Sequence, residues 1–325
     1  MSLLGAVLTT LALSSSTTSS PALQFDLGSG DDVVRFEPLV LLQVDARAVL
    51  HDDDNAVEGE SGFVIPRGRL GGRLRWRFFD VQVIGEGARE KAGLLEAFGV
   101  VHVGDFAVDV GLARSPLLIG GPDPLSLQPL NERSVLERTM WPGRELGVGV
   151  RWSPTTLPVE AWARVSNGVA NAVLGNDNDG LAADARIDGV FGSAALPRRR
   201  ALAADHIGHD DDDRDFLGLR VGVGARVERT DNEAGMPGIT ALNATYWRAP
   251  PVSGPSTTLQ AHAQGFLGPA RLTVQGAFAH ESRARDDDGN PSTPKVPVVG
   301  VQHAGASAEV AAVVVGERRV FGTMA

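Results

Sequence analysis

Apolar and polar residues alternate one by one along much of this chain, and this period of two residues constrains the fold more than any other feature. In the segment 33–50 the even positions carry apolar residues or proline, whereas the odd positions include polar residues such as Arg35 and Glu37. The same alternation returns at 159–166, 217–228, 259–266 and 271–280. Successive side chains of a β-strand point to opposite faces, so each segment is predicted to be a strand with one apolar and one polar face. The pattern predicts an all-β chain.

The composition excludes several classes of protein. The chain has 325 residues, a formal net charge of −10 and no cysteine. The negative charge argues against a nucleic-acid partner, which needs a basic surface, and the lack of cysteine excludes disulfides and zinc–thiolate sites. The mean hydropathy is −0.03, and no apolar run reaches the length of about 18 residues that a membrane-spanning helix needs. A membrane β-barrel is compatible with these values, because its alternating strands average to near-neutral hydropathy.

Strand lengths and connections favour a transmembrane antiparallel β-barrel. About fourteen strands of about 9–12 residues are expected between positions 33 and 315. Some connections are short, and others are long and acidic, namely 51–55, 176–180, 209–215 and 286–290. Short turns at one rim and long polar loops at the other are typical of outer-membrane barrels. A soluble sandwich or propeller with many strands is the alternative.

The N-terminus predicts an exported protein. An apolar run at 3–13 has the length of a signal-peptide core, and small polar residues and a plausible cleavage site after Ala22 follow it. The alternative is a disordered or buried N-terminal segment. We therefore expect a signal peptide at 1–22, a linker at 23–32 and a barrel domain at 33–325.

Several short motifs occur along the chain in an order that a known family shares. They are an arginine-rich strand at 63–70, an acidic-aromatic strand start at 94–98, a strand end with Val-Gly, a basic residue and Pro at 109–116, a long connection and strand re-entry at 134–138 and 142–148, a strand-ending Asn-Gly at 166–168, an acidic loop leading to an arginine at 179–186, and Gly-Glu-Arg-Arg at 316–319. Together these motifs resemble the phosphate-selective porin O and P family of Gram-negative outer membranes.

The resemblance implies a porin-type barrel of about sixteen strands that lies in the outer membrane and assembles as a homotrimer. It also implies contact with outer-membrane lipid and lipopolysaccharide, and diffusion of small phosphate-like anions through the lumen. By the same comparison the chain lacks the last strands and the terminal aromatic residue, so the barrel domain would be C-terminally incomplete. A non-functional truncated porin is therefore one alternative.

Five arginines form the most pronounced constellation, and all of them are at odd positions: Arg67, Arg69, Arg73, Arg75 and Arg77. On a continuous strand they share one face. A hairpin at Gly71 and Gly72 would keep them together if its turn has three residues and would separate them if it has two. A lipid-facing arginine costs about 2–4 kcal/mol at mid-bilayer, so in a barrel these side chains face the lumen.

Two interpretations of this row of arginines stay open. In the first, the arginines and Arg114 line an anion pathway and offer planar donors to phosphate or carboxylate. In the second, the arginines only stabilise the wall by pairing with Glu37, Asp45 and Glu86. The first interpretation predicts an anion-selective lumen.

The segment 115–141 is the second candidate site. By the resemblance it folds into the lumen as a constriction loop, whereas an outward surface loop is the alternative. The candidate residues in this segment and at the following strand start are Arg133, Glu137, Arg138 and Arg144. Arg144 is either a structural pairing partner or a pore residue.

No metal site, cofactor or catalytic site is expected. The acidic segment at 175–180 fails the EF-hand pattern, because Gly175 stands at the first ligand position and Arg186 stands where glutamate is required. Such segments are solvated loops or bridge divalent cations loosely to lipopolysaccharide. His206 and His209 are close in sequence but lack further ligands in a predicted loop. No nucleophile elbow or phosphate-binding glycine loop is present.

The sequence therefore predicts an outer-membrane channel that passes small anions by passive diffusion through an arginine-lined lumen, and not an enzyme. A secreted or surface β-protein whose acidic loops bind ligands or cations is the alternative from a different class. The channel requires a continuous lipid-facing apolar band, and the binding protein requires a buried core with both sheet faces covered.

Overall fold

The computed structural model describes residues 25–29, 32–47, 62–88, 91–119, 134–154, 156–168, 180–192, 217–230, 237–239, 245–248, 254–267, 270–285 and 296–312. These residues form fifteen strands and one helix, and thirteen of the strands pair into one antiparallel sheet. The predicted all-β fold is confirmed. About fourteen strands were expected from the alternation, which is close to the number that the described residues form.

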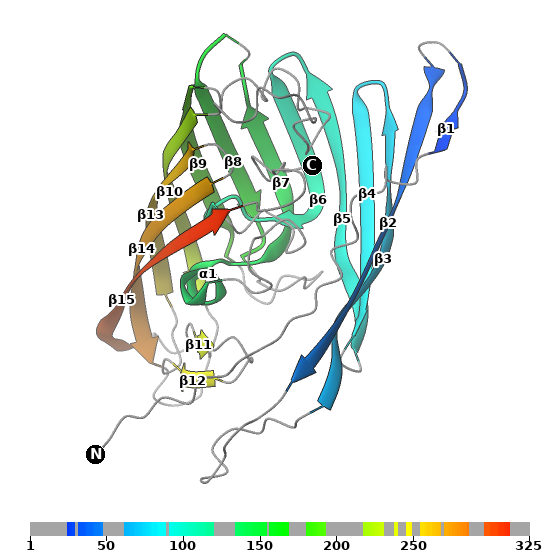
Figure 1. Ribbon diagram of the computed structural model, residues 1–325. Coiled ribbons are helices and arrows are strands. Elements are labelled where there is room, and N and C mark those ends of the chain that lie inside the picture. The colour runs from blue at the N-terminus through cyan, green and yellow to red at the C-terminus, as the bar shows by residue number, and fades with distance from the viewer. Residues whose placement is uncertain are drawn as a thin grey trace. The chain divides into compact units, whose positions relative to one another are not determined.

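The chain divides into two compact units, Met1–Ala97 and Phe98–Ala325. In the first unit each strand pairs with the next strand along the chain (Figure 1). The strands are β1 (Phe25–Leu27), β2 (Val34–Arg47), β3 (Gly62–Trp76), β4 (Phe79–Ala88) and β5 (Lys91–Val103), whose last residues belong to the second unit. β1 lies within the linker expected at 23–32, and its Phe25 pairs in register with Phe36 of β2.

In the second unit the paired strands also follow the order of the chain (Figure 1). They are β6 (Phe106–Arg114), β7 (Arg144–Trp152), β8 (Val159–Ser166), β9 (Ala182–Gly192), β10 (Leu217–Thr230), β13 (Gly254–Leu267), β14 (Ala270–Arg285) and β15 (Val296–Ala312). Two short strands, β11 (Pro237–Ile239) and β12 (Thr245–Arg248), form a separate sheet. The helix α1 (Val135–Met140) precedes β7.

β3 runs without interruption through Gly71 and Gly72, so the hairpin that the two glycines suggested does not form there. The chain reverses instead at Arg77 and Phe78, and Arg77 adopts a positive φ of 51°. Gly71 is required by close packing between strands, because a Cβ there would lie 2.2 Å from the carbonyl oxygen of Val83. The four arginines that precede the turn therefore share one face of a single strand.

The order of the described strands begins at β1 and ends at β15, and it contains no pairing between these two strands. Closure into a barrel therefore stays a prediction. Within the described ranges, no helix is long and apolar enough to cross a membrane. The predicted signal peptide at 1–22, the motif at 316–319, and His206 and His209 lie outside the described residues.

Candidate functional site

In the second unit the charged face of the sheet is the buried face. The strands β8 and β9 show this clearly, since Trp162 lies opposite Arg186 and Arg164 lies opposite Asp184 on the buried side. Arg164 is only 3% exposed, whereas its neighbour Val165, on the other side of the strand, is 50% exposed. A sheet face in a water-soluble protein shows the opposite arrangement, with apolar residues inside and polar residues outside.

The same inversion continues through β10, β13 and β14. Their exposed face carries large apolar side chains, namely Leu219, Val221, Val223, Leu259, Leu272, Val274 and Phe278. Their buried face carries polar and charged side chains, namely Arg220, Arg226, Gln260, His262, Gln264, Gln275 and Glu281. Burying charges is costly unless they are paired and hydrogen-bonded, so this face depends on an internal network of contacts.

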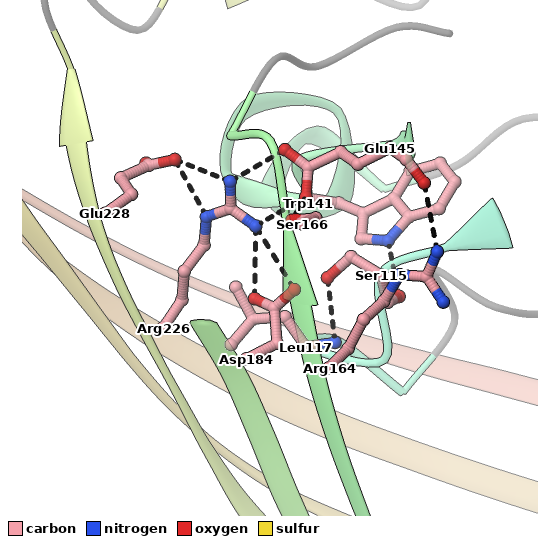
Figure 2. Close-up of polar contacts among 9 residues, drawn as sticks. All are labelled: Ser115, Leu117, Trp141, Glu145, Arg164, Ser166, Asp184, Arg226 and Glu228. Carbon is pink, nitrogen blue, oxygen red and sulfur yellow. Dashed lines mark hydrogen bonds and ion pairs between the residues drawn. The ribbon is translucent and has the colours of Figure 1, made fainter. Parts of the chain in front are cut away.

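Arg226 of β10 is the centre of a buried cluster of carboxylates (Figure 2). Its two Nη atoms donate to both carboxylate oxygens of Glu145 at 2.8 and 2.9 Å, and Nη1 also donates to Asp184 at 3.1 Å. Its Nε donates to Glu228 at 2.9 Å. The hydroxyl of Ser166 donates to Glu145 at 2.7 Å. One guanidinium therefore joins β7, β9 and β10, and its planar set of five donors suits such multiple pairing.

Arg164 of β8 forms a second buried anchor. It pairs with the carboxylate of Asp109 in β6. Its Nη2 donates to the backbone carbonyl oxygens of Gly111 at 2.7 Å and of Glu145 at 3.1 Å. Arg164 thus joins side chains and backbone of three strands, β6, β7 and β8, at one point of the charged face.

A third cluster surrounds Asp188 of β9, whose side chain is fully buried. The Nε atom of Arg186 is 3.3 Å from its carboxylate, and Nε of Arg220 donates to it at 3.0 Å. Nε2 of His262 in β13 is 3.2 Å from the second carboxylate oxygen. The guanidiniums of both arginines also lie near the ring of Trp162, at 4.3 and 5.6 Å from its centroid. Cation–π contact and ion pairing therefore hold the two arginines together on this face.

The helix α1 and the turn at 115–119 lie against the charged face, on the inner side of the curve that β6 to β15 make in Figure 1. Glu137 of α1 accepts a hydrogen bond from Gln275 of β14 at 2.9 Å. The indole Nε1 of Trp141 donates to the carbonyl oxygen of Ser115 at 3.0 Å (Figure 2). An apolar cluster joins the two pieces to β14, and its buried members are Leu117, Leu118, Leu136, Met140 and Ala277.

In the first unit, residues of β2 and β4 supply acidic or polar partners to the arginines of β3, and Asp32, just before β2, pairs with Arg77 of the turn that follows β3. The contacts are Arg69–Glu86 at 3.1 Å, Arg73–Asp80 at 2.7 Å, Arg75–Glu37 at 3.5 Å, Arg77–Asp32, and a hydrogen bond from Arg67 to Gln43. Two of the partners expected for wall stabilisation, Glu37 and Glu86, are therefore present. The third, Asp45, pairs in register with Val64, and its side chain lies outside the described part of the structure.

The remaining candidates lie at the ends of β6 and β7 and on α1. Arg114 at the end of β6 is in register with Arg144 at the start of β7, and both are partly buried. The guanidinium of Arg144 is 6.0 Å from the ring centroid of Trp141. Arg138 lies in the last turn of α1, and Arg133 lies outside the described residues.

Sequence reasoning missed the centres of the buried clusters. These are Glu145, Arg164, Asp184, Asp188, Arg220 and Arg226. Three of them, Arg164, Arg220 and Arg226, were visible as polar positions of alternating segments, which is the only local signal that they carry. Their grouping was not visible, because Arg226 and Glu145 are 81 residues apart in the chain.

Two comparisons with known proteins identified no relative of this chain. A scan against protein-family models found no matching family, and a search of curated proteins found no match. The porin resemblance of the sequence therefore stays a prediction that the site has to support by its own geometry.

Proposed function

We propose that this chain forms an outer-membrane β-barrel of the porin type, through which small solutes diffuse. The observation that carries the proposal is the inverted polarity of the sheet in the second unit, with apolar side chains exposed and charged side chains buried. Soluble monomers rarely expose contiguous apolar patches larger than a few hundred Å². Hydrocarbon is the surrounding that suits such a face, and alternation of apolar-out and polar-in is typical of membrane barrels.

The distribution of charge supports the same proposal. In the described parts of β8, β9 and β13, the exposed face carries no Asp, Glu, Lys or Arg. A lipid-facing arginine or lysine costs about 2–4 kcal/mol at the bilayer midplane, so a lipid-facing surface has to exclude these residues. The exposed face favours the membrane barrel over a secreted β-protein, whose sheet would need both faces covered.

The arginines of β3 support a preference for small anions, such as phosphate. They stand at polar positions of one strand and offer planar donors, which bind phosphate and carboxylate well. Carboxylates of β2 and β4 pair with Arg69, Arg73 and Arg75, so the field that a solute meets is weaker than that of bare arginines. We therefore propose a modest anion preference. Contact with lipopolysaccharide and assembly as a homotrimer belong to the same proposal.

Reconstitution of the purified chain in a planar lipid bilayer tests this function. The expected result is stepwise conductance and, in a salt gradient, a reversal potential with the sign of an anion preference. The double variant Arg69→Ala/Arg75→Ala should move the reversal potential towards zero, because it removes two guanidiniums from the row. The control is Arg229→Ala, at the exposed end of β10, which should leave the reversal potential unchanged.

The two parts of the proposal fail separately. Folded protein that inserts into the bilayer without conductance steps overturns the channel. Conductance with a reversal potential of the opposite sign overturns the anion preference and leaves the channel standing.

A further inference from the structure

The turn at 115–119 is attached to the charged face through its backbone as well as through its apolar side chains. Leu117 and Leu118 are fully buried. The backbone N–H of Ser115 donates to the carbonyl oxygen of Gly143 at 3.0 Å, and the carbonyl oxygen of Ser115 accepts from Trp141 at 3.0 Å. The turn is therefore held to Trp141 and Gly143, two residues that lie just before β7.

Arg186 of β9 makes a polar connection from the charged face to this turn. Its Nη1 donates to the carbonyl oxygens of Pro116 at 2.8 Å and of Leu118 at 3.2 Å. The guanidinium cannot rotate freely, since Asp188 pairs with its Nε at 3.3 Å and Trp162 lies 4.3 Å from its centre. The side chain is only 2% exposed. It therefore presents two directed, charge-assisted hydrogen bonds to the backbone of the turn.

The position of the helix α1 depends on the same turn. Leu136 and Met140 share a buried apolar cluster with Leu117 and Leu118 of the turn. A Cβ on Gly305 of β15 would lie 2.8 Å from Cδ1 of Leu136, so the helix packs directly on the backbone of the wall. Displacement of the turn therefore removes the apolar contacts that Leu117 and Leu118 make with α1.

We infer that Arg186 is the positioning residue that holds the 115–119 turn, and through it α1, against the charged face of the sheet. Arg186 thereby sets how far the turn and α1 project into the solute pathway. The predicted change in conductance rests on the proposed function. The attachment of the turn and α1 to the charged face (their seating) does not. Arginine is required, because lysine offers a compact ammonium that does not hold the same planar orientation between Asp188, Trp162 and two carbonyl oxygens.

A disulfide between α1 and the wall tests the seating without any measurement of conductance. The chain has no cysteine, so the variant Leu136→Cys/Gly305→Cys carries the only two thiols. We expect mild oxidant to cross-link them in the full-length, detergent-solubilised protein. Adding Arg186→Met should slow the cross-link about tenfold, since two charge-assisted hydrogen bonds are lost. Adding Arg271→Met, which removes a partly buried arginine of β14 that pairs with Glu309, should not slow it.

Three outcomes of this experiment overturn the inference. They are no cross-link in the parent double cysteine variant, an equal rate with and without Arg186, and equal slowing by Arg186→Met and Arg271→Met. If Arg186→Met does not fold, Arg186→Lys takes its place, because it keeps a positive charge near Asp188 while losing the paired donors. The lysine variant should then show an intermediate rate.

Bilayer recordings connect the seating to the solute pathway. Arg186→Met alone should increase the current noise of the open channel, because α1 is no longer held at one position. Oxidation of Arg186→Met combined with the two cysteines should return the noise to the parent level, which a general loss of stability would not allow. If the cross-link leaves the current noise unchanged, the position of α1 does not affect conductance, and the proposed role of Arg186 in the solute pathway is overturned. A protein that cross-links as expected but never conducts overturns the proposed function and not the seating.

Discussion

Removal of the Arg226 guanidinium should destabilise this protein more than removal of any single surface charge. In the variant Arg226→Met, Glu145 and Asp184 lose the group that lies between them, and both carboxylates are completely buried. Breaking a buried ion pair from one side typically costs about 3–5 kcal/mol, because the remaining charge has neither water nor a partner. Two such carboxylates meet at Arg226, so we expect a loss in the upper part of this range.

The control is Arg271→Met, which removes another arginine from the same face of the sheet. Among the described residues Arg271 forms an ion pair with Glu309 alone, and the two side chains are 14% and 32% exposed. Water reaches this pair, so its removal should cost about 0.2–1 kcal/mol. The difference between the two variants isolates the effect of burial.

Urea unfolding in lipid vesicles or detergent, followed by tryptophan fluorescence, measures both losses by linear extrapolation. The chain has 5 tryptophans, and Trp76, Trp152 and Trp162 lie in strands of the large sheet and report on it. The substitutions Glu145→Gln and Asp184→Asn, added to Arg226→Met, should recover at least about 1 kcal/mol, because they remove the uncompensated charges. Equal losses in Arg226→Met and Arg271→Met, or a further loss on adding the amides, would refute the role given to this cluster.

Further predictions concern the two faces of the sheet and the seat of the helix. Val223 is 55% exposed. If it faces lipid, Val223→Arg should lower the free energy of unfolding by about 2–4 kcal/mol, clearly more than Val223→Ala does. On a water-facing strand the arginine would be harmless. Gly222→Ala should cost about 1–3 kcal/mol by overpacking, because its Cβ would lie 2.1 Å from a carboxylate oxygen of Asp188. Gly265→Ala, with nothing within 4 Å of the added Cβ, is the matched control and should leave the unfolding midpoint unchanged. Trp141→Phe should lower stability by about 0.5–1.5 kcal/mol through loss of the indole hydrogen bond, and an unchanged unfolding midpoint would contradict that contact.

Local alternation was sufficient to predict the strands and some of the nearest contacts. The pairing of Arg69 with Glu86 spans 17 residues within one hairpin, and it was expected as one of two interpretations. The pairing of Arg73 with Asp80 was missed although the two are only 7 residues apart. The reason is that the sequence left the position of the turn open, and the reversal at Arg77 and Phe78 is what brings Asp80 within reach of Arg73.

Contacts between distant strands were beyond prediction from the sequence. Arg186 reaches the carbonyl oxygen of Pro116 across 70 residues of sequence, and Arg164 pairs with Asp109 across 55 residues. Each contact depends on the register of every hairpin between its partners. A shift of one residue in any of them would turn a whole set of side chains to the other face.

The sequence by itself determined which side chains share a face, since the two-residue period of a strand is a property of a few neighbouring residues. In β10 the spacing of the residues alone separates Arg220 and Arg226 from Val221 and Val223. Only the tertiary structure decided which of the two faces is buried and which carboxylate meets which guanidinium. Burial and pairing depend on the strands, the turn and the helix that pack around each residue, and these come from distant parts of the chain.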